Sequence, residues 1–382
     1  MVFSGVDHLA VSWNFGNSNL VISVPHAGTL GADQTPNGNL KCPSGNLVES
    51  RKGTLEHPLK HYGRDTGTDV IASRIESILD EEGMRPHVIT CHIHRNKVEV
   101  NRDISKKAVQ HRGGEAEYIY TTYHRWISQA LQISRDSSAI HASLLIDLHG
   151  HGHPHNYIEL GYRIPGLMLN EIEKASTGKQ SRQTYTLALL EDLKYFSIPE
   201  SFLERDSENF EENSRTRSWR TIVTSPVKHE FTLNSLISRK FGTTNESLKE
   251  SLIGQDSFAG SLSKHLERFS ILKDIQCIPS LAKPSPARLG YYIGGYTVLK
   301  HAKWKGVDAI QIELPTAVRT RPGEMRDAMI VALSSGIKDF HNKHYYADNT
   351  GKCFYNNLRI VLVLCLFTYN GRENPIQVLE FK

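Results

Sequence analysis

Three short, continuously apolar segments constrain the fold of this chain most strongly. They are LVISVP at 20–25, ASLLIDLHG at 142–150 and DAIQIELP at 308–315. Each has the length of a strand, and none alternates between apolar and polar residues as a strand with one solvated face does. Strands that are apolar on both faces are typical of a parallel sheet that helices cover on both sides.

Amphipathic segments between these strands supply the helices. Residues 68–83 gather apolar side chains near one helical face and put Gly83 where a helix C-cap belongs. Residues 116–134 and 325–345 also predict helices, and residues 87–95 predict a further strand. The alternation predicts an α/β fold with a mixed, largely parallel central sheet and helices on both faces.

The composition is that of an ordinary globular protein and narrows the choice of partners. Of 382 residues, 39% are hydrophobic and 23% are charged, and the formal net charge is only +4. We find no run of Lys and Arg interleaved with aromatic residues, so we expect no nucleic-acid partner. The longest apolar run, residues 360–367, is too short to span a bilayer and predicts a buried strand, so we expect no membrane partner.

Cysteine usage and the first residues of the sequence indicate a cytoplasmic protein. The five cysteines are scattered, odd in number and never spaced as CxxC. This pattern fits a reducing compartment and argues against a zinc site made of cysteines. The segment MVFSGVDHLAVSW lacks a basic region followed by an apolar stretch, so it is not typical of a signal peptide.

We expect a single domain over residues 1–346. A charged insertion is predicted around residues 174–256, because residues 204–220 are charged and lack aliphatic periodicity. Residues 347–382 differ in character from the rest and carry no functional signal, so we treat them as a C-terminal extension.

Polar side chains stand where the predicted strands end. They are His26, Asn101, Arg102, His149 and Glu313. In an open α/β sheet, sites form beyond the carboxyl ends of the strands, so we expect these side chains to meet. Taken singly, each is more often a structural histidine, a paired carboxylate or a surface residue than a catalytic one.

The set contains the parts of a mononuclear zinc hydrolase. The segment YGRDTGTD, before the first predicted helix, adds the carboxylates of Asp65 and Asp69. Two imidazoles and one carboxylate hold Zn²⁺ and leave a fourth position open for water. A separate carboxylate takes the proton from that water. An Arg grips a substrate carboxylate through paired hydrogen bonds.

A histidine-rich run, LLIDLHGHGHPH, allows three interpretations: a metal site, a solvated loop, or a site in which one histidine matters. We favour His149, because it closes the strand. Asp147 lies two residues earlier and points to the same face, where it either orients His149 or is an unrelated buried acid. His151, His153 and His155 follow on a stretch broken by Gly and Pro, and we expect them to rim a pocket.

Longer motifs extend these clusters. They are ISVPHAG, DTGTD, HRNKVEVNRD, LLIDLHGHG with IELGYRI, SLIGQDSFAGSLSKHLERF, IPSLAKPSP and GGYTVLKHAKWKGVDAIQIELPTAVR. In these motifs, from about residue 20 to residue 345, the chain resembles the N-formylglutamate amidohydrolases, within the superfamily of zinc carboxypeptidases and aspartoacylases. The resemblance implies a fold like that of zinc carboxypeptidases and phosphorylase/hydrolase-like proteins, and one zinc ion per chain.

The resemblance also implies the zinc ligands. His26 in PHAG looks like the first ligand, and His149 in DLHGH looks like the last. The carboxypeptidase pattern has a Glu three residues after the first His, but this chain has Thr29 there, so the carboxylate comes from elsewhere. We choose Asp65 in RDTGTD, with Asp69 as the alternative. Two imidazoles and a carboxylate also suit iron or cobalt.

The remaining roles follow from the same resemblance. Glu313 in QIELP looks like the general base. Asn101 and Arg102 match the pair that holds a substrate carboxylate, and Arg95 polarises the scissile carbonyl or joins that clamp. The segment YYIGGYTVLKH is expected to line the pocket, where its two glycines either let the backbone approach a ligand or form a plain tight turn.

We therefore expect a zinc-dependent hydrolase that cleaves an amide bond in small N-acyl amino acids such as N-formylglutamate, with a small-molecule carboxylate as substrate. One alternative is a zinc peptidase of carboxypeptidase type, because insertions can open or close the pocket. Another is a non-catalytic protein that binds a carboxylate or a metal ion. A binder, however, has no need of a base such as Glu313.

Overall fold

The computed structural model describes the greater part of the first 346 residues. The described residues are 10–30, 40–41, 47–48, 51, 63–164, 231–237, 239, 245–283 and 291–346. The predicted strand at 360–367, the predicted extension at 347–382 and most of the predicted insertion lie outside them. The division of the chain into a domain and an extension therefore stays a prediction.

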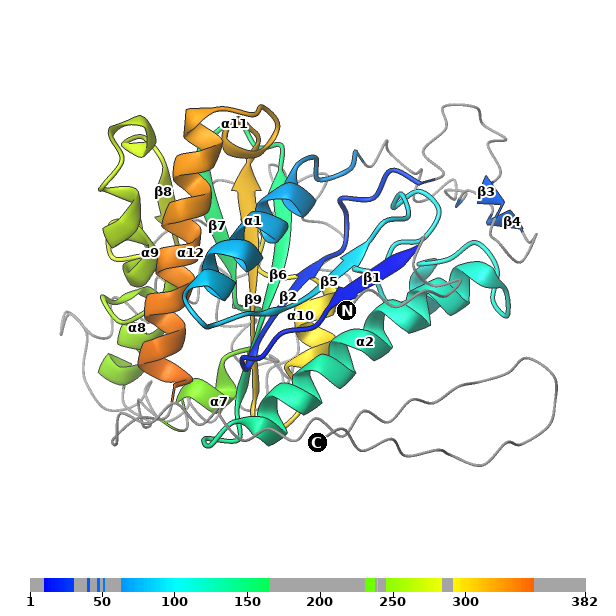
Figure 1. Cartoon of the computed structure of the whole chain (residues 1–382), viewed down its shortest axis with the longest axis horizontal. Helices are drawn as coiled ribbons and strands as arrows, with labels where there is room; N and C mark the ends of the chain where they lie inside the picture. Colours follow the sequence, from blue (N-terminus) through cyan, green and yellow to red (C-terminus); the bar gives the residue numbers. More distant parts are fainter. Residues whose placement is uncertain are drawn as a thin grey trace, which may run out of the picture. The chain divides into compact units, whose positions relative to one another are not determined.

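A seven-stranded sheet forms the centre of the fold, in the order β1-β5-β2-β6-β9-β7-β8 (Figure 1). The strands are β1 (Val11–Asn14), β5 (His87–Cys91), β2 (Leu20–Val24), β6 (Ser143–His151), β9 (Val307–Pro315), β7 (Tyr157–Gly161) and β8 (Gln276–Ile278). The four strands β5, β2, β6 and β9 are parallel. Strand β1 runs antiparallel to β5, and β7 runs antiparallel to β9 but parallel to β8. The predicted mixed, largely parallel sheet is confirmed.

Helices lie on both faces of this sheet. Those with most contact to it or to each other are α1 (Thr68–Glu81), α2 (Glu115–Ser137), α9 (Phe258–Leu266), α10 (Tyr296–His301) and α12 (Glu324–His344). The shorter elements are β3 (Leu40–Lys41), β4 (Leu47–Val48), η2 (Ile104–Lys106), α7 (Asn234–Leu236), α8 (Asn245–Ile253), η4 (Ser270–Leu272) and α11 (Thr316–Arg319). No helix in the described part of the chain has the length and apolarity that a membrane crossing requires.

Alternation along the central strands produces two cores. In β6, Leu144, Ile146 and Leu148 pack with the apolar residues of α1, α9 and α12. Leu145 points the other way and packs with α2 and α10. Because successive side chains of a strand point to opposite faces, Asp147 lies on the α2 side of the sheet.

The predicted elements agree closely with the observed ones, with one informative difference. Helix α1 begins at Thr68 as expected, and Gly83 follows its end with φ +78°. The strand predicted for 87–95, however, ends at Cys91. Beyond it the chain makes an isolated bridge and then turns, because the N–H of Lys97 donates to the carbonyl of His94. That turn brings Arg95 and the following residues back over the sheet.

The connections on either side of β2 reverse the strand order. The chain leaves β2 through α1 on one face to reach β5. It then leaves β5 through α2 on the other face to reach β6, on the opposite side of β2. The carboxyl ends of β2 and β6 are thus adjacent at the point where strand order reverses, which is where α/β sheets place their ligand sites.

Two buried histidines on the α2 side make the fold sensitive to acid. His124 and His301 lie 3.1 Å apart, Nδ1 to Nε2, and His124 Nε2 donates to the carbonyl of Val100. Burial lowers the pKa of His301 from 6.5 to about 3 and holds the pKa of His124 well below 6.5. Both rings are therefore neutral in the folded chain at neutral pH.

We expect the free energy of unfolding to fall as the pH falls from 6.5 towards 3. In this window the unfolded chain binds more protons than the folded chain, so each of the two histidines removes about 1.4 kcal/mol per pH unit. Denaturant unfolding at a series of pH values measures the slope. His301→Gln should reduce it, and exposed His111→Ala should leave it unchanged. An equal slope in all three proteins would contradict this account.

Candidate metal centre

A row of polar side chains crosses the otherwise apolar sheet at the carboxyl ends of its central strands. His149 on β6 is in register with Glu313 on β9, and Glu313 is in register with Glu159 on β7. Two residues earlier, Asp147 accepts a hydrogen bond of 2.6 Å from the Ser23 hydroxyl of β2. All these side chains lie on the α2 side, because they share the parity of Leu145.

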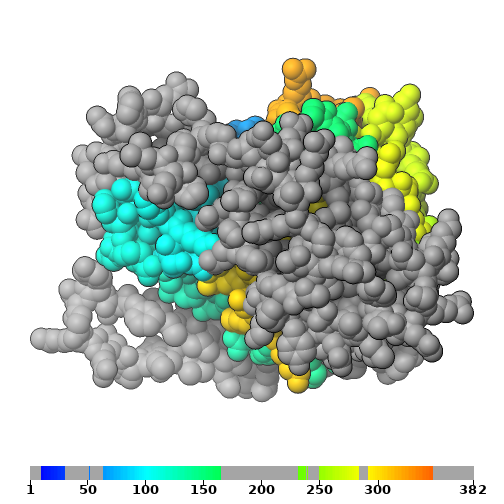
Figure 2. All heavy atoms as spheres, turned by 180° about the vertical axis from the view of Figure 1, so that it is seen from behind, coloured from blue at the N-terminus to red at the C-terminus, as the bar shows by residue number. Residues whose placement is uncertain are grey.

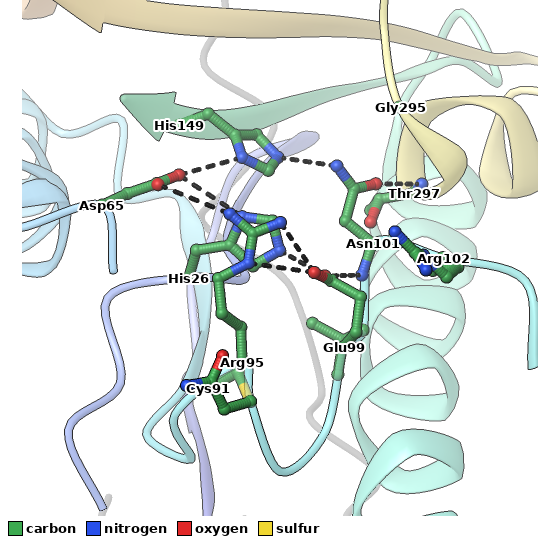
Figure 3. A network of polar contacts seen from close by, with 12 residues as sticks. His26, Asp65, Cys91, Arg95, Glu99, Asn101, Arg102, His149, Gly295 and Thr297 are labelled. Atoms are coloured by element: carbon green, nitrogen blue, oxygen red, sulfur yellow. Dashed lines mark hydrogen bonds and ion pairs between the residues drawn. The ribbon is translucent and has the colours of Figure 1, made fainter. Parts of the chain in front are cut away.

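Three buried side chains converge beside this row. Nδ1 of His149 lies 3.1 Å from Oδ2 of Asp65, and Nδ1 of His26 lies 3.4 Å from the same oxygen (Figure 3). One ligand atom from each of the three residues lies within 4.8 Å of the other two. His26 follows β2 directly and His149 belongs to β6, so the adjacent ends of these strands bring the two rings together.

The outer nitrogens of both rings are held by other carboxylates. Nε2 of His26 lies 2.5 Å from Glu99 Oε1, and Nε2 of His149 lies 2.9 Å from Asp147 Oδ2. Carboxylates that hold the second nitrogen of a metal-binding histidine fix its tautomer and orientation. Nδ1 of His26 is buried and makes no hydrogen bond within the described residues, as expected of a nitrogen that faces a cation.

Asp65 is placed by the backbone around it. Its N–H donates to the carbonyl of His26 at 2.9 Å, and its Oδ2 accepts from the N–H of Gly150 at 3.1 Å. Gly67, with φ +88°, lets the chain turn from this loop into α1. Asp69 lies exposed in the first turn of α1. Of the two candidate carboxylates, the structure therefore brings only Asp65 to the histidines.

Buried groups of both charges meet at the site. Asp65, Glu99, Asp147 and Glu313 are all buried. Arg95 donates from Nε and Nη2 to Glu99 Oε2, at 2.9 and 2.6 Å, and a second guanidinium, that of Arg51, approaches the same carboxylate. The two guanidinium groups thus lie closest to Glu99, and Asp65 is paired chiefly with the two imidazoles.

The carboxylates and imidazoles of the cluster shift one another's pKa values. Burial raises the pKa of Asp65, but the adjacent imidazoles of His149 and His26 outweigh burial and hold the pKa well below its ordinary range. Burial lowers the pKa of His149, but Asp147 and Asp65 raise it well above its ordinary value. A proton and a metal ion compete for such a nitrogen, so acid weakens metal binding at this cluster.

Glu313 is a buried carboxylate that a neighbour on the same strand holds in place. Gln311 donates from Nε2 to Glu313 Oε1 at 2.8 Å, and its own Oε1 accepts from the N–H of Gly295 at 2.6 Å. Burial, opposed by His149 and reinforced by Asp65, raises the pKa of Glu313 to about 8. A cation at the neighbouring histidines would favour the ionised form, in which this carboxylate can accept a proton.

Asn101 and Arg102 lie beside the cluster. Asn101 Oδ1 accepts from the N–H of Thr297, and its Nδ2 lies 3.1 Å from Nε2 of His149 (Figure 3). Arg102 is half-buried next to it. A side chain at Gly295 would collide with the amide of Asn101, so that glycine allows the close approach of backbone to Asn101.

Four supporting residues were not predicted from the sequence. They are Glu99, Glu159, Gln311 and Arg319. Arg319 donates to three backbone carbonyls, those of Leu314, Thr66 and His151, and so ties together the loops around the site. A sequence signal existed only for Gln311, which shares a strand face with Glu313 two residues later.

The other three histidines of the run do not join the His26 cluster. His151 is buried, and His153 and His155 are half-buried. His153 and His155 both contact Glu159 instead. With Glu159 of β7 they form a second group of side chains, at the end of β6 and in the segment that leads to β7.

Comparisons with known proteins leave the family of the chain unassigned. No protein-family model and no curated protein matches the sequence. Among solved structures, the chain is similar to the crystal structure of gene product Atu2144 from Agrobacterium tumefaciens, with 10% sequence identity and a TM-score of 0.40. The alignment covers 89% of this chain and 98% of that one. At this level the similarity supports no inference about function.

We expect Asp65→Asn to lose most of its zinc affinity and Asp69→Asn to keep it, because only Asp65 faces both histidines. Competition with a chromophoric zinc chelator measures both affinities, and exposed Asp69 also serves as the matched control for loss of a carboxylate. A larger loss for Asp69→Asn than for Asp65→Asn would assign the carboxylate to the helix and contradict the arrangement described above.

Proposed function

We propose that this protein is a metal-dependent hydrolase that cleaves the amide bond of small N-acyl amino acids, as the N-formylglutamate amidohydrolases do. One observation carries the proposal: Nδ1 of His26 and Nδ1 of His149 face one buried carboxylate oxygen of Asp65, with a separate buried carboxylate, Glu313, in register beside His149. The sequence motifs that resemble that family contain all four residues.

His26, Asp65 and His149 would hold the metal ion, one per chain, and zinc suits two imidazoles and a carboxylate. The same donors also suit iron or cobalt. When bound, the ion would lower the pKa of a coordinated water towards about 7 and polarise a carbonyl. Glu99 and Asp147 would keep the two imidazoles in the tautomer that presents Nδ1.

Glu313 is the proposed general base. It would accept the proton of the attacking water and return it to the departing amine, so that no net proton remains on the enzyme. Gln311 supports this role because its amide hydrogen bond fixes one carboxylate oxygen. Arg95 is the proposed aid to the scissile carbonyl, although its guanidinium is already engaged by Glu99.

Arg102 and Asn101 are the proposed contacts to the substrate carboxylate. A guanidinium matches a carboxylate through two parallel hydrogen bonds. Asn101 lies directly beside His149, so a carboxylate held at this position would keep an attached amide close to the metal ligands. An N-acyl amino acid and the C-terminal residue of a peptide both place the scissile amide at this short separation, so the preference for the deacylase rests on the sequence resemblance.

We expect Glu313→Gln to lower kcat by at least 10²-fold and to keep the zinc, because Gln preserves the shape of the side chain but accepts no proton. Release of free amine from N-formyl-, N-acetyl- and longer N-acyl-glutamate, with zinc content measured in parallel, tests this expectation. The matched control is exposed Glu324→Gln, in the first turn of α12. Full activity of Glu313→Gln would remove Glu313 as the base.

We expect Arg102→Ala to raise KM roughly 10-fold or more with a smaller change in kcat, because it removes a charge-assisted contact to the substrate carboxylate. Arg112→Ala, an exposed guanidinium paired with Glu117, is the control. A substrate whose carboxylate is amidated should lose the difference between wild type and Arg102→Ala. An unchanged KM in Arg102→Ala would exclude this residue from the clamp.

A further inference from the structure

A second cluster of ligand-type side chains lies beyond the first, where the chain passes from β6 to β7. It consists of His151, His153, His155 and Glu159. In the view from behind, residues of this part of the chain (green) reach the surface beside the segment around α11 (orange) and the segment between α9 and β8 (yellow-green) (Figure 2). The cluster has no role in the function proposed above.

A buried carboxylate organises the cluster. Glu159 is fully buried, and its Oε1 accepts hydrogen bonds from Nδ1 of His153 at 2.6 Å and Nε2 of His155 at 2.8 Å. Its Oε2 accepts from the N–H of Tyr292 at 2.8 Å. One carboxylate oxygen thus faces two imidazoles, as Oδ2 of Asp65 faces two imidazoles in the first cluster.

Hydrogen bonds fix the tautomer of the third imidazole, that of His151. Nε2 of His151 lies 2.7 Å from the carbonyl of Tyr157, an acceptor only, so this nitrogen carries the proton and Nδ1 does not. The N–H of His153 donates to that Nδ1 at 3.2 Å, so an ion at this nitrogen would replace that hydrogen bond. A histidine that donates its outer N–H to a backbone carbonyl is arranged as metal-binding histidines are.

The rings are close enough to share one ion. Their centroids are 5.1 Å apart for His151 and His153, 5.2 Å for His153 and His155, and 5.5 Å for His151 and His155. One ligand atom each from His151, His153 and Glu159 lies within 4.8 Å of the other two. The ring of His153 also stacks on Tyr292, at 4.7 Å and 7°, which restrains its orientation.

We propose that His151, His153 and Glu159, with His155 beside them, form a second site for a divalent transition-metal ion, separate from the site at His26, Asp65 and His149. Imidazole and carboxylate donors suit zinc, cobalt, nickel and copper. The site lies one strand beyond the proposed base, because Glu159 is the register partner of Glu313. An ion there would fasten the segment between β6 and β7 to the sheet.

The test is the number of zinc ions per full-length chain, measured by plasma mass spectrometry after loading with zinc and removal of weakly bound metal. We expect about two in wild type and about one in both His153→Ala and His26→Ala. His153→Gln can still donate a hydrogen bond to Glu159, so it controls for a folding defect in His153→Ala. We expect it to hold one zinc ion as well. The control is exposed His111→Ala, which should hold two.

The two sites fail separately in this experiment. One ion in wild type that survives in His153→Ala and is lost in His26→Ala overturns the second site alone. One ion that is lost in His153→Ala and kept in His26→Ala supports the second site and overturns the first. If wild type holds one ion and both variants lose it, the two clusters share that ion. If His153→Ala keeps two ions, the second ion binds elsewhere. Either result overturns a separate second site. A second ion that a weak chelator removes and that does not raise Tm is an adventitious ion only. That result also overturns the second site.

Discussion

The contact of one carboxylate oxygen of Asp65 with the two imidazoles of His26 and His149 is the interaction on which the account depends. It gathers a loop and the ends of two strands into a buried region. A buried charge of this kind is costly unless it is paired. The two imidazoles and, at 4.0 Å, the guanidinium of Arg95 pair this charge, while Glu99 and Asp147 hold the outer nitrogens of the imidazoles.

The fold makes this concentration of polar groups possible. The carboxyl ends of the four parallel strands lie at the same end of the sheet. Alternation along the strands sends aliphatic side chains into two separate cores, while His149 of β6 and Glu313 of β9 face the site. The antiparallel partner β7 then extends the row by one strand and brings Glu159 opposite Glu313. The same pairing links the two histidine clusters, so the histidine-rich run is divided between them: His149 faces the first and the later histidines face the second.

Much of this arrangement could be predicted from the sequence, and the remainder has physical reasons for being hidden. Continuous apolar strands and amphipathic helices predict the sheet and its layers, and His26, His149 and Glu313 stand at strand ends. Glu99 could not be predicted, because it reaches the site only after the chain turns back beyond β5. Glu159 depends on an antiparallel register between β7 and β9 that no local pattern encodes. Asp65 could be preferred to Asp69 because of the motif resemblance and because Asp69 falls inside the predicted helix, but only the structure brings Asp65 to the two histidines.

Anomalous diffraction from crystals of the zinc-loaded protein, recorded above and below the zinc edge, tests the central claim most directly. The account predicts a peak at about 2.0–2.1 Å from Nδ1 of His26 and from Nδ1 of His149, with a carboxylate oxygen of Asp65 at about 2.0–2.2 Å. Glu313 should lie near that peak without ligating it. No peak at these three residues in protein that retains zinc, or a peak bonded to Nε2 instead, would contradict the account.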